Sequence, residues 1–179
     1  PEGAEGVRLM AGGALAAARL AVAAGRPQGG QADGDGGAGP VLAAAANLGG
    51  GFHHAFPSHG EGFCLYNDAA VAIRVLQRDG VIGRAAIVDV DVHQGNGTAF
   101  IFDDDPSVFT YSIHQEHNYP HVKPRGSLDV GLPDGTGDRE YLHALERALP
   151  VVLASRPDLI VYVAGADPYV EDQLGGLCL

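Results

Sequence analysis

The sequence is poor in basic residues and in cysteine. Its 179 residues include 11 Lys and Arg against 22 Asp and Glu, which gives a formal net charge of −11 at pH 7. Because nucleic acids and anionic membranes bind basic surfaces, this balance argues against both as partners. The two cysteines, Cys64 and Cys178, form no CxxC pair and are too few for a disulfide scaffold. We expect two reduced thiols in a cytoplasmic protein.

The sequence also lacks a long, strongly hydrophobic run. Its most apolar stretch, from Leu9 to Ala24, consists mostly of alanine and glycine and is interrupted by Arg19. Since a membrane span needs about 20 strongly apolar residues, we expect no transmembrane segment. The chain opens with Pro1-Glu2-Gly3, without the basic start of a signal peptide and without an initiator methionine. We therefore expect an internal fragment of a longer protein.

What is present is the pattern of one globular α/β domain. Hydrophobic residues make up 46% of the chain, and apolar strand patterns alternate with helical ones. The expected strands span residues 41–48, 85–91, 107–113 and 158–164. The expected helices span residues 8–24, 67–79, 97–102 and 138–149, and Pro150 is expected to open a further helical turn. Because the strands are apolar on both faces, we predict a mostly parallel central sheet covered by helices on both faces. Residues 25–40 are rich in glycine and are expected to form a flexible loop.

Polar residues collect at the predicted carboxyl ends of these strands, where ligands bind in such folds. Asp91 and His93 are two positions apart, so in an extended segment both side chains can reach one ion. Asp167 follows another strand and is expected at the same edge. Two carboxylates and one imidazole form a three-ligand set that leaves room for water, as a catalytic zinc requires. Strand-end capping is the alternative role of these aspartates.

A second candidate feature is the tandem pair His53-His54, which lies in a glycine-rich turn. Paired imidazoles can act as acid and base or as electrostatic stabilisers. Each ring needs a hydrogen-bond partner that sets its tautomer, and Asp89 and Asn96 are the candidates. By itself the pair is a weak signal, because buried structural histidines are common.

Together these motifs resemble the zinc-dependent histone deacetylase superfamily, in particular its bacterial deacetylase-like and acetylpolyamine amidohydrolase members. The motifs that carry the resemblance are Gly-Gly-Gly-Phe-His-His-Ala at 49–55, Gly-Phe-Cys-Leu-Tyr-Asn-Asp at 62–68, Asp-Val-Asp-Val-His-Gln-Gly-Asn-Gly-Thr at 89–98 and Gly-Ala-Asp-Pro-Tyr at 165–169. The resemblance implies an arginase/deacetylase-like fold that is incomplete here. It implies a single domain over residues 1–179, truncated at the C-terminus and also at the N-terminus.

The resemblance also implies roles for individual residues. Asp91, His93 and Asp167 would bind one catalytic zinc. His53, held by Asp89, would act mainly electrostatically, and His54, paired with Asn96, would be the general base and then the general acid. The implied tunnel for the acyl chain is lined by Gly62, Phe63 and Tyr119. The implied potassium site uses mainly main-chain oxygens of Asp89, Asp91, His93, Ser112 and Ile113. The substrate would be an acetylated lysine, an acetylated polyamine or another small amide.

The sequence departs from the family pattern in two respects. Asn96 stands where many members have an aspartate, and a neutral amide stabilises an imidazolium less well than a carboxylate does. The carbonyl-polarising tyrosine of the family is expected beyond Leu179, so we expect the isolated chain to be weak or inactive.

Other interpretations remain open at this point. One is a non-catalytic acyl-lysine binder or scaffold with the same fold. Another is an arginase-like manganese hydrolase, which would need a carboxylate where Gly95 stands. For Phe63 and Tyr119, the alternative to a tunnel wall is ordinary core packing.

Overall fold

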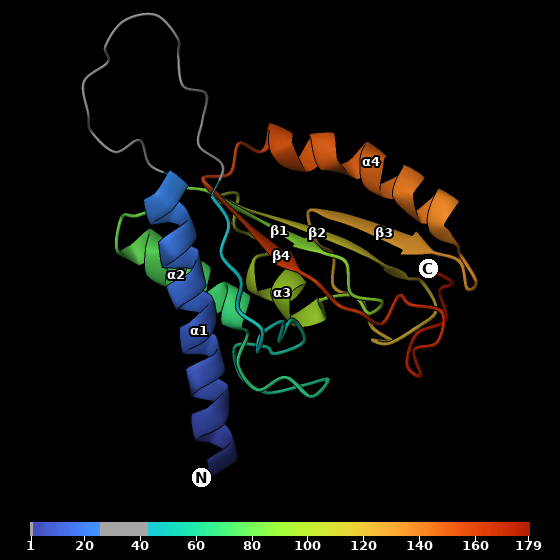
Figure 1. The fold of residues 1–179 in the computed structure, drawn as a ribbon, viewed down its shortest axis with the longest axis horizontal. Coiled ribbons are helices and arrows are strands. Elements are labelled where there is room, and N and C mark those ends of the chain that lie inside the picture. Colours follow the sequence, from blue (N-terminus) through green and yellow to red (C-terminus); the bar gives the residue numbers. More distant parts are fainter. Residues whose placement is uncertain (1, 26–42) are drawn as a thin grey trace, which may run out of the picture.

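The chain folds as a four-stranded parallel sheet between helices (Figure 1). The computed structural model describes residues 2–25 and 43–179, so the expected loop at 25–40 lies outside the described residues except for Gly25, which ends a helix. The elements in chain order are α1 (Glu2–Gly25), α2 (Asp68–Arg78), β1 (Ala85–Asp89), α3 (Asn96–Ile101), β2 (Val108–Gln115), β3 (Leu128–Leu132), α4 (Asp138–Ala154) and β4 (Leu159–Val163). The predicted α/β class is confirmed.

The order of the strands determines which chain segments meet at the site. The sheet runs β3-β2-β1-β4, so the central strand β1 has β2 on one side and β4 on the other. The register pairs Asp89, the last residue of β1, with Ser112 of β2 and with Val163 of β4. The segments that follow β1 and β4 therefore leave the sheet at the same edge.

Each face of the sheet has its own hydrophobic core, as a parallel sheet requires. On one face, Ile73 and Leu76 of α2 pack with Ile87 of β1, and helix α1 adds Leu15 and Val22 at the margin. On the other face, Val88 of β1 and Tyr111 of β2 pack with residues of α4 such as Val152. All five residues of β1 are buried, which anchors the strand that leads into the site.

Local sequence explains where the helices begin. Asn67 caps α2 by accepting a hydrogen bond from the Ala70 N–H, 3.0 Å away. Helix α4 begins after Gly137 with Asp138 and Glu140 in its first turn, where carboxylates suit the helix dipole. It continues through Pro150 to Ala154, so the expected separate turn at Pro150 is part of one helix.

Two expectations about strands are wrong. Residues 43–48, the described part of the strand expected at 41–48, form no strand, and most of their alanines are exposed. Alanine has a small side chain and low strand propensity, so this run gains little from joining the sheet. Strand β3 has no counterpart among the expected strands. Its sequence, Leu-Asp-Val-Gly-Leu, contains two poor strand formers. The strand lies at the edge of the sheet, and its residues alternate between partial burial and exposure up to Leu132, which is buried.

One helix bears on the expectation that the chain contains no transmembrane segment. Within the described residues, Glu5–Gly25 of α1 is long and apolar enough for a span by length and composition, and only 11% of its most apolar window is buried. Arg19 does not disqualify it. A core helix or a signal sequence meets the same criteria, so this finding does not assign α1 to a membrane.

Candidate metal centre and histidine pair

The predicted metal ligands converge at the carboxyl edge of the sheet. Asp91 and His93 follow β1, and Asp167 follows the adjacent strand β4. One ligand atom from each residue lies within 4.8 Å of the others, and this is the one such group of three or more found in the described part of the chain. His93 Nδ1 lies 3.0 Å from Asp91 Oδ1 and 3.0 Å from Asp167 Oδ2. The three residues are partly buried, so the group remains open to solvent on one side.

Backbone contacts hold the two carboxylates in place. The Val92 N–H donates to Asp167 Oδ1 at 2.9 Å, and the His93 N–H donates to Asp91 Oδ1 at 2.9 Å. Gly165 lies so close that a Cβ at this position would be 2.5 Å from Asp91 Oδ2. Only glycine lets the chain after β4 pass the Asp91 side chain at this distance.

The electrostatics of the three ligands favour a bound cation. Burial would lower the pKa of His93, but hydrogen bonds to Asp167 and Asp91 raise it to about 9. Burial would raise the pKa of Asp91, but the hydrogen bond with His93 and the charge of His53 hold it at about 2. The site thus stabilises positive charge between two carboxylates. This donor set of two carboxylate oxygens and one imidazole nitrogen fits zinc.

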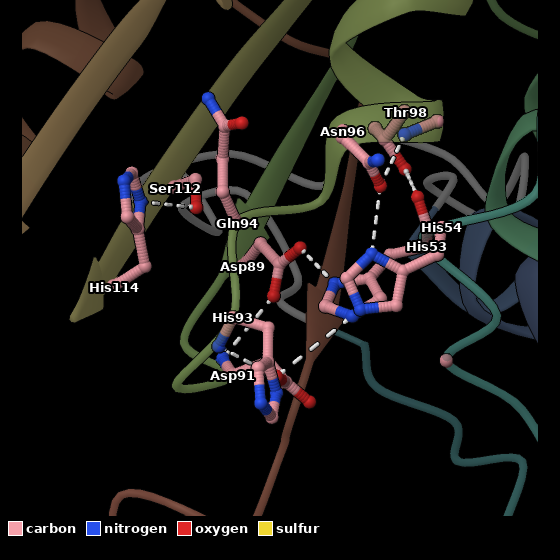
Figure 2. A network of polar contacts seen from close by, with 12 residues as sticks. His53, His54, Asp89, Asp91, His93, Gln94, Asn96, Thr98, Ser112 and His114 are labelled. Carbon is pink, nitrogen blue, oxygen red and sulfur yellow. Dashed lines mark hydrogen bonds and ion pairs between the residues drawn. The ribbon is translucent and has the colours of Figure 1, made fainter. Parts of the chain in front are cut away.

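The two tandem histidines are buried beside this group (Figure 2). Their rings lie 4.0 Å apart, and His53 Nε2 is 3.8 Å from Asp91 Oδ1. His53 Nδ1 is paired with Asp89 Oδ2 at 2.6 Å, and His54 Nδ1 is paired with Asn96 Oδ1 at 2.7 Å. The structure therefore brings together the four residues predicted to form the catalytic set.

The environments of the two rings move their pKa values apart. Burial would lower the pKa of His53, but the adjacent Asp89 carboxylate raises it above its usual value. Burial and the neighbouring His53 lower the pKa of His54 to about 4. This arrangement favours a neutral His54 at neutral pH, while the Asp89 carboxylate favours the charged form of His53. Opposite shifts in neighbouring groups are typical of acid and base partners in active sites.

The loop that carries the histidines is fastened to two helices. The Asp68 carboxylate of α2 accepts hydrogen bonds from the backbone N–H groups of Gly51 and Phe52 at 2.8–3.2 Å. The His53 carbonyl accepts from the Thr98 N–H of α3 at 3.0 Å. In the sequence, the Asn67-Asp68 pair indicated only a helix start, so the loop-anchoring role of Asp68 was missed.

The predicted tunnel residues lie around His54, but they differ in exposure. Gly62 adopts a φ of 52°, and a Cβ there would lie 2.3 Å from His54 Cδ2, so this glycine closes against the ring. Tyr119 meets the His54 ring edge-on at 4.9 Å. Phe63 is 100% exposed, which excludes core packing for this side chain. Glu61, which the sequence analysis did not single out, accepts hydrogen bonds from both Tyr119 and Asn96.

Other polar residues near the site have different surroundings. Ser112 donates or accepts a hydrogen bond with His114 Nδ1 at 3.0 Å, and Figure 2 shows this pair on β2, away from the tandem histidines. Cys64 is a buried free thiol whose pKa is raised by burial to about 11, which agrees with packing rather than nucleophilic chemistry.

These features define a class of protein: an α/β domain with a candidate metal centre and a histidine pair at the carboxyl edge of its parallel sheet. The histone deacetylase domain matches residues 1–179. An uncharacterized protein of Picosynechococcus is 53% identical over 136 residues, which cover 75% of this chain and 45% of that protein. The acetoin utilization protein AcuC of Bacillus subtilis is 38% identical over 143 residues, covering 73% of this chain and 37% of AcuC.

The chain belongs to the histone deacetylase family. Its fold is similar to the crystal structure of the acetylpolyamine aminohydrolase from Burkholderia pseudomallei, with a TM-score of 0.72 and 25% identity over 94% of this chain and 48% of that one. The family resemblance drawn from the motifs is confirmed. The chain spans less than half the length of these relatives.

Proposed function

We propose that the protein containing this chain is a zinc-dependent amidohydrolase that removes an acetyl or acyl group from an acetylated lysine or an acetylated amine. The observation that carries the proposal is the convergence of Asp91, His93 and Asp167 beside His53 and His54. Each side chain in this group has a neighbour that fixes its orientation. Such preorganisation is what hydrolysis of an unreactive amide requires.

The chain's own residues divide the proton chemistry between them. When bound by Asp91, His93 and Asp167, zinc supplies a Lewis acid that polarises the amide carbonyl and lowers the pKa of water. His54, neutral at pH 7 with Asn96 on its Nδ1, takes a proton from the attacking water through Nε2 and returns it to the leaving amine. His53, whose charged form is favoured by its contact with Asp89, stabilises the negative charge that develops on the oxygen.

Gly62, Phe63 and Tyr119 would form the walls that hold the acyl chain over this pair. The closeness of Gly62 and Tyr119 to the His54 ring supports this assignment, and the exposure of Phe63 leaves its ring free to contact a substrate. The name of one relative, an acetylpolyamine aminohydrolase, suggests small acetylated amines as substrates as well as acetylated proteins.

We further propose a potassium ion bound mainly by main-chain oxygens of Asp89, Asp91, His93, Ser112 and Ile113. The pairing of Asp89 with Ser112 in the sheet places the relevant backbone segments side by side. This ion would stiffen the turn that presents Asp91 and His93.

Zinc content and hydrolysis together test the proposal. Elemental analysis should find about one zinc per folded chain in the wild type and in the control Asp104→Ala, an exposed aspartate away from the site. Asp91→Ala should lose the zinc and, in the full-length protein, the hydrolysis of an acetylated lysine peptide, while its circular dichroism spectrum is unchanged. Zinc-free wild-type protein that is folded would contradict the ligand assignment. Peptide binding without hydrolysis in the full-length protein would favour the acyl-lysine binder instead.

A further inference from the structure

Glu61 lies behind the His54–Asn96 pair and ties it to Tyr119. Its Oε1 atom accepts a hydrogen bond from Asn96 Nδ2 at 2.6 Å and another from the Tyr119 hydroxyl at 2.6 Å. Asn96 is 2% exposed, whereas the Glu61 side chain is 32% exposed. A partly exposed carboxylate is thus directed inward by two donors that converge on a single oxygen.

These contacts determine the orientation of the Asn96 amide. The backbone N–H of Gly97 can only donate, and it donates to Asn96 Oδ1 at 3.0 Å. The Glu61 carboxylate can only accept when ionised, so it must face the Asn96 NH2 group. Both ends of the amide are therefore fixed, and Oδ1 faces His54.

The orientation of Asn96 in turn determines the tautomer of His54. Because Asn96 Oδ1 is an acceptor, His54 Nδ1 must carry the proton in the 2.7 Å hydrogen bond between them. His54 Nε2 then holds the lone pair, which is the form a general base needs. The hydrogen bonds from Tyr119 and then from Asn96 keep the pKa of Glu61 below its usual range, so the carboxylate is charged at neutral pH.

We propose that Glu61 is a positioning residue that acts through Asn96: it locks His54 in the Nδ1–H tautomer and supplies the negative charge that Asn96 itself lacks. This inference rests on the proposed hydrolytic function of the same site. A carboxylate–amide–imidazole chain replaces the direct carboxylate–imidazole contact, since polarised hydrogen bonds in series strengthen one another in a buried site. Tyr119 fixes the outer end of this chain.

A pair of substitutions in the full-length, zinc-loaded protein tests the relay. Glu61→Ala removes one of the two contacts that orient the Asn96 amide, and we expect kcat to fall about 10- to 100-fold, the usual cost of losing a hydrogen-bond partner that orients a site residue, with a smaller change in KM. Adding Asn96→Asp to this variant restores most of kcat, because the new carboxylate pairs with His54 directly. Asn96→Asp alone should reduce kcat, since it places two carboxylates at the 2.6 Å contact. The effect of Asn96→Asp thus reverses sign with the residue at 61.

A purely structural role for Glu61 would not produce this reversal. Glu140→Ala is the matched control, because Glu140 lies on the outer part of α4 and pairs only with Arg139 among the described residues. It should leave kcat unchanged. The inference would be overturned if Asn96→Asp changed kcat by the same factor and in the same direction in the wild type and in Glu61→Ala. A Glu61→Ala variant with wild-type kcat would also overturn it.

A spectroscopic measurement tests the inference without turnover. Long-range 15N–1H correlation spectra at fixed pH should show His54 as the Nδ1–H tautomer in the wild type and as a mixture of tautomers in Glu61→Ala. An Nε2–H tautomer in the wild type, or an unchanged spectrum in the variant, would overturn the inference. Absence of hydrolysis in the wild type would instead refute the proposed function and leave this measurement to decide the role of Glu61.

Discussion

Replacing Gly62 with alanine should disable the site with only a modest loss of stability. Gly62 has a φ of 52°, a conformation that costs an L-residue roughly 1–2 kcal/mol. An added Cβ would lie 2.3 Å from His54 Cδ2, while real Cβ atoms essentially never come closer than 3.0 Å. The ring or the loop must therefore move by at least about 0.7 Å in a close-packed site. Since displacing a catalytic group by about 1 Å can cost about 100-fold in rate, we expect kcat to fall by about that factor.

Gly80→Ala is the matched control for this prediction. Gly80 has a φ of 67°, and a Cβ there would meet no atom of the described residues within 4 Å, so the variant carries the same backbone cost without the contact. Urea unfolding should show a loss of roughly 1–2 kcal/mol for the control and at least as much for Gly62→Ala. Hydrolysis of an acetylated lysine peptide by the full-length protein should be unchanged in Gly80→Ala only. Equal kcat values in the two variants would refute the argument that Gly62 shapes the position of His54.

Three further predictions concern the metal, the core and the thiols. With its pKa raised to about 9, His93 is protonated in the metal-free site at pH 7, so zinc binding should release about one proton and should tighten as the pH rises towards 9. Calorimetry in two buffers of different ionisation enthalpy measures this proton release, and a binding enthalpy that does not depend on the buffer would contradict it. Ile73→Ala, at a fully buried position, should lower the unfolding free energy by about 2–5 kcal/mol. The control Val71→Ala, at a position that is 40% exposed, should lower it far less. Equal losses of the two variants in denaturant unfolding would count against the assigned core. At pH 7 iodoacetamide should modify the exposed Cys178 and spare the buried Cys64, whose pKa is raised to about 11. If mass spectrometry found both thiols modified in the folded chain, the burial of Cys64 would be contradicted.

Most of the fold was predictable where the sequence carries a strong local pattern. The strand at 85–89 begins with an uninterrupted apolar run, Ala85–Val88, and the helix that begins at Asp68 has a capping asparagine before it. Predictions failed where local and tertiary preferences differ. Strand β3 contains Asp129 and Gly131 and exists because β2 offers it a partner, whereas the alanine run at 43–48 finds no place in the sheet.

The site could be predicted in part for a similar reason. Asp91 and His93 are close in sequence, so both lie in the short segment that follows β1, although this segment is bent and not extended as the spacing argument assumed. The role of Glu61 could not be predicted, because its partner Asn96 is 35 positions away and the two meet only when the loop after His54 folds against α3. No local pattern distinguishes this glutamate from an ordinary surface carboxylate.

The sequence by itself determined the chemical groups of the site and their place at the ends of apolar strands, because the alternation of strands and helices and the spacing of Asp91 and His93 are local properties. The tertiary structure decided which of these groups meet. The order β3-β2-β1-β4 places Asp167 beside Asp91, and the packing of the histidine loop between α2 and α3 gives His53 a carboxylate partner and His54 an amide. Burial would lower the pKa of both rings, but the Asp89 carboxylate raises that of His53, so the two pKa values move in opposite directions, which no property of the isolated dipeptide could do.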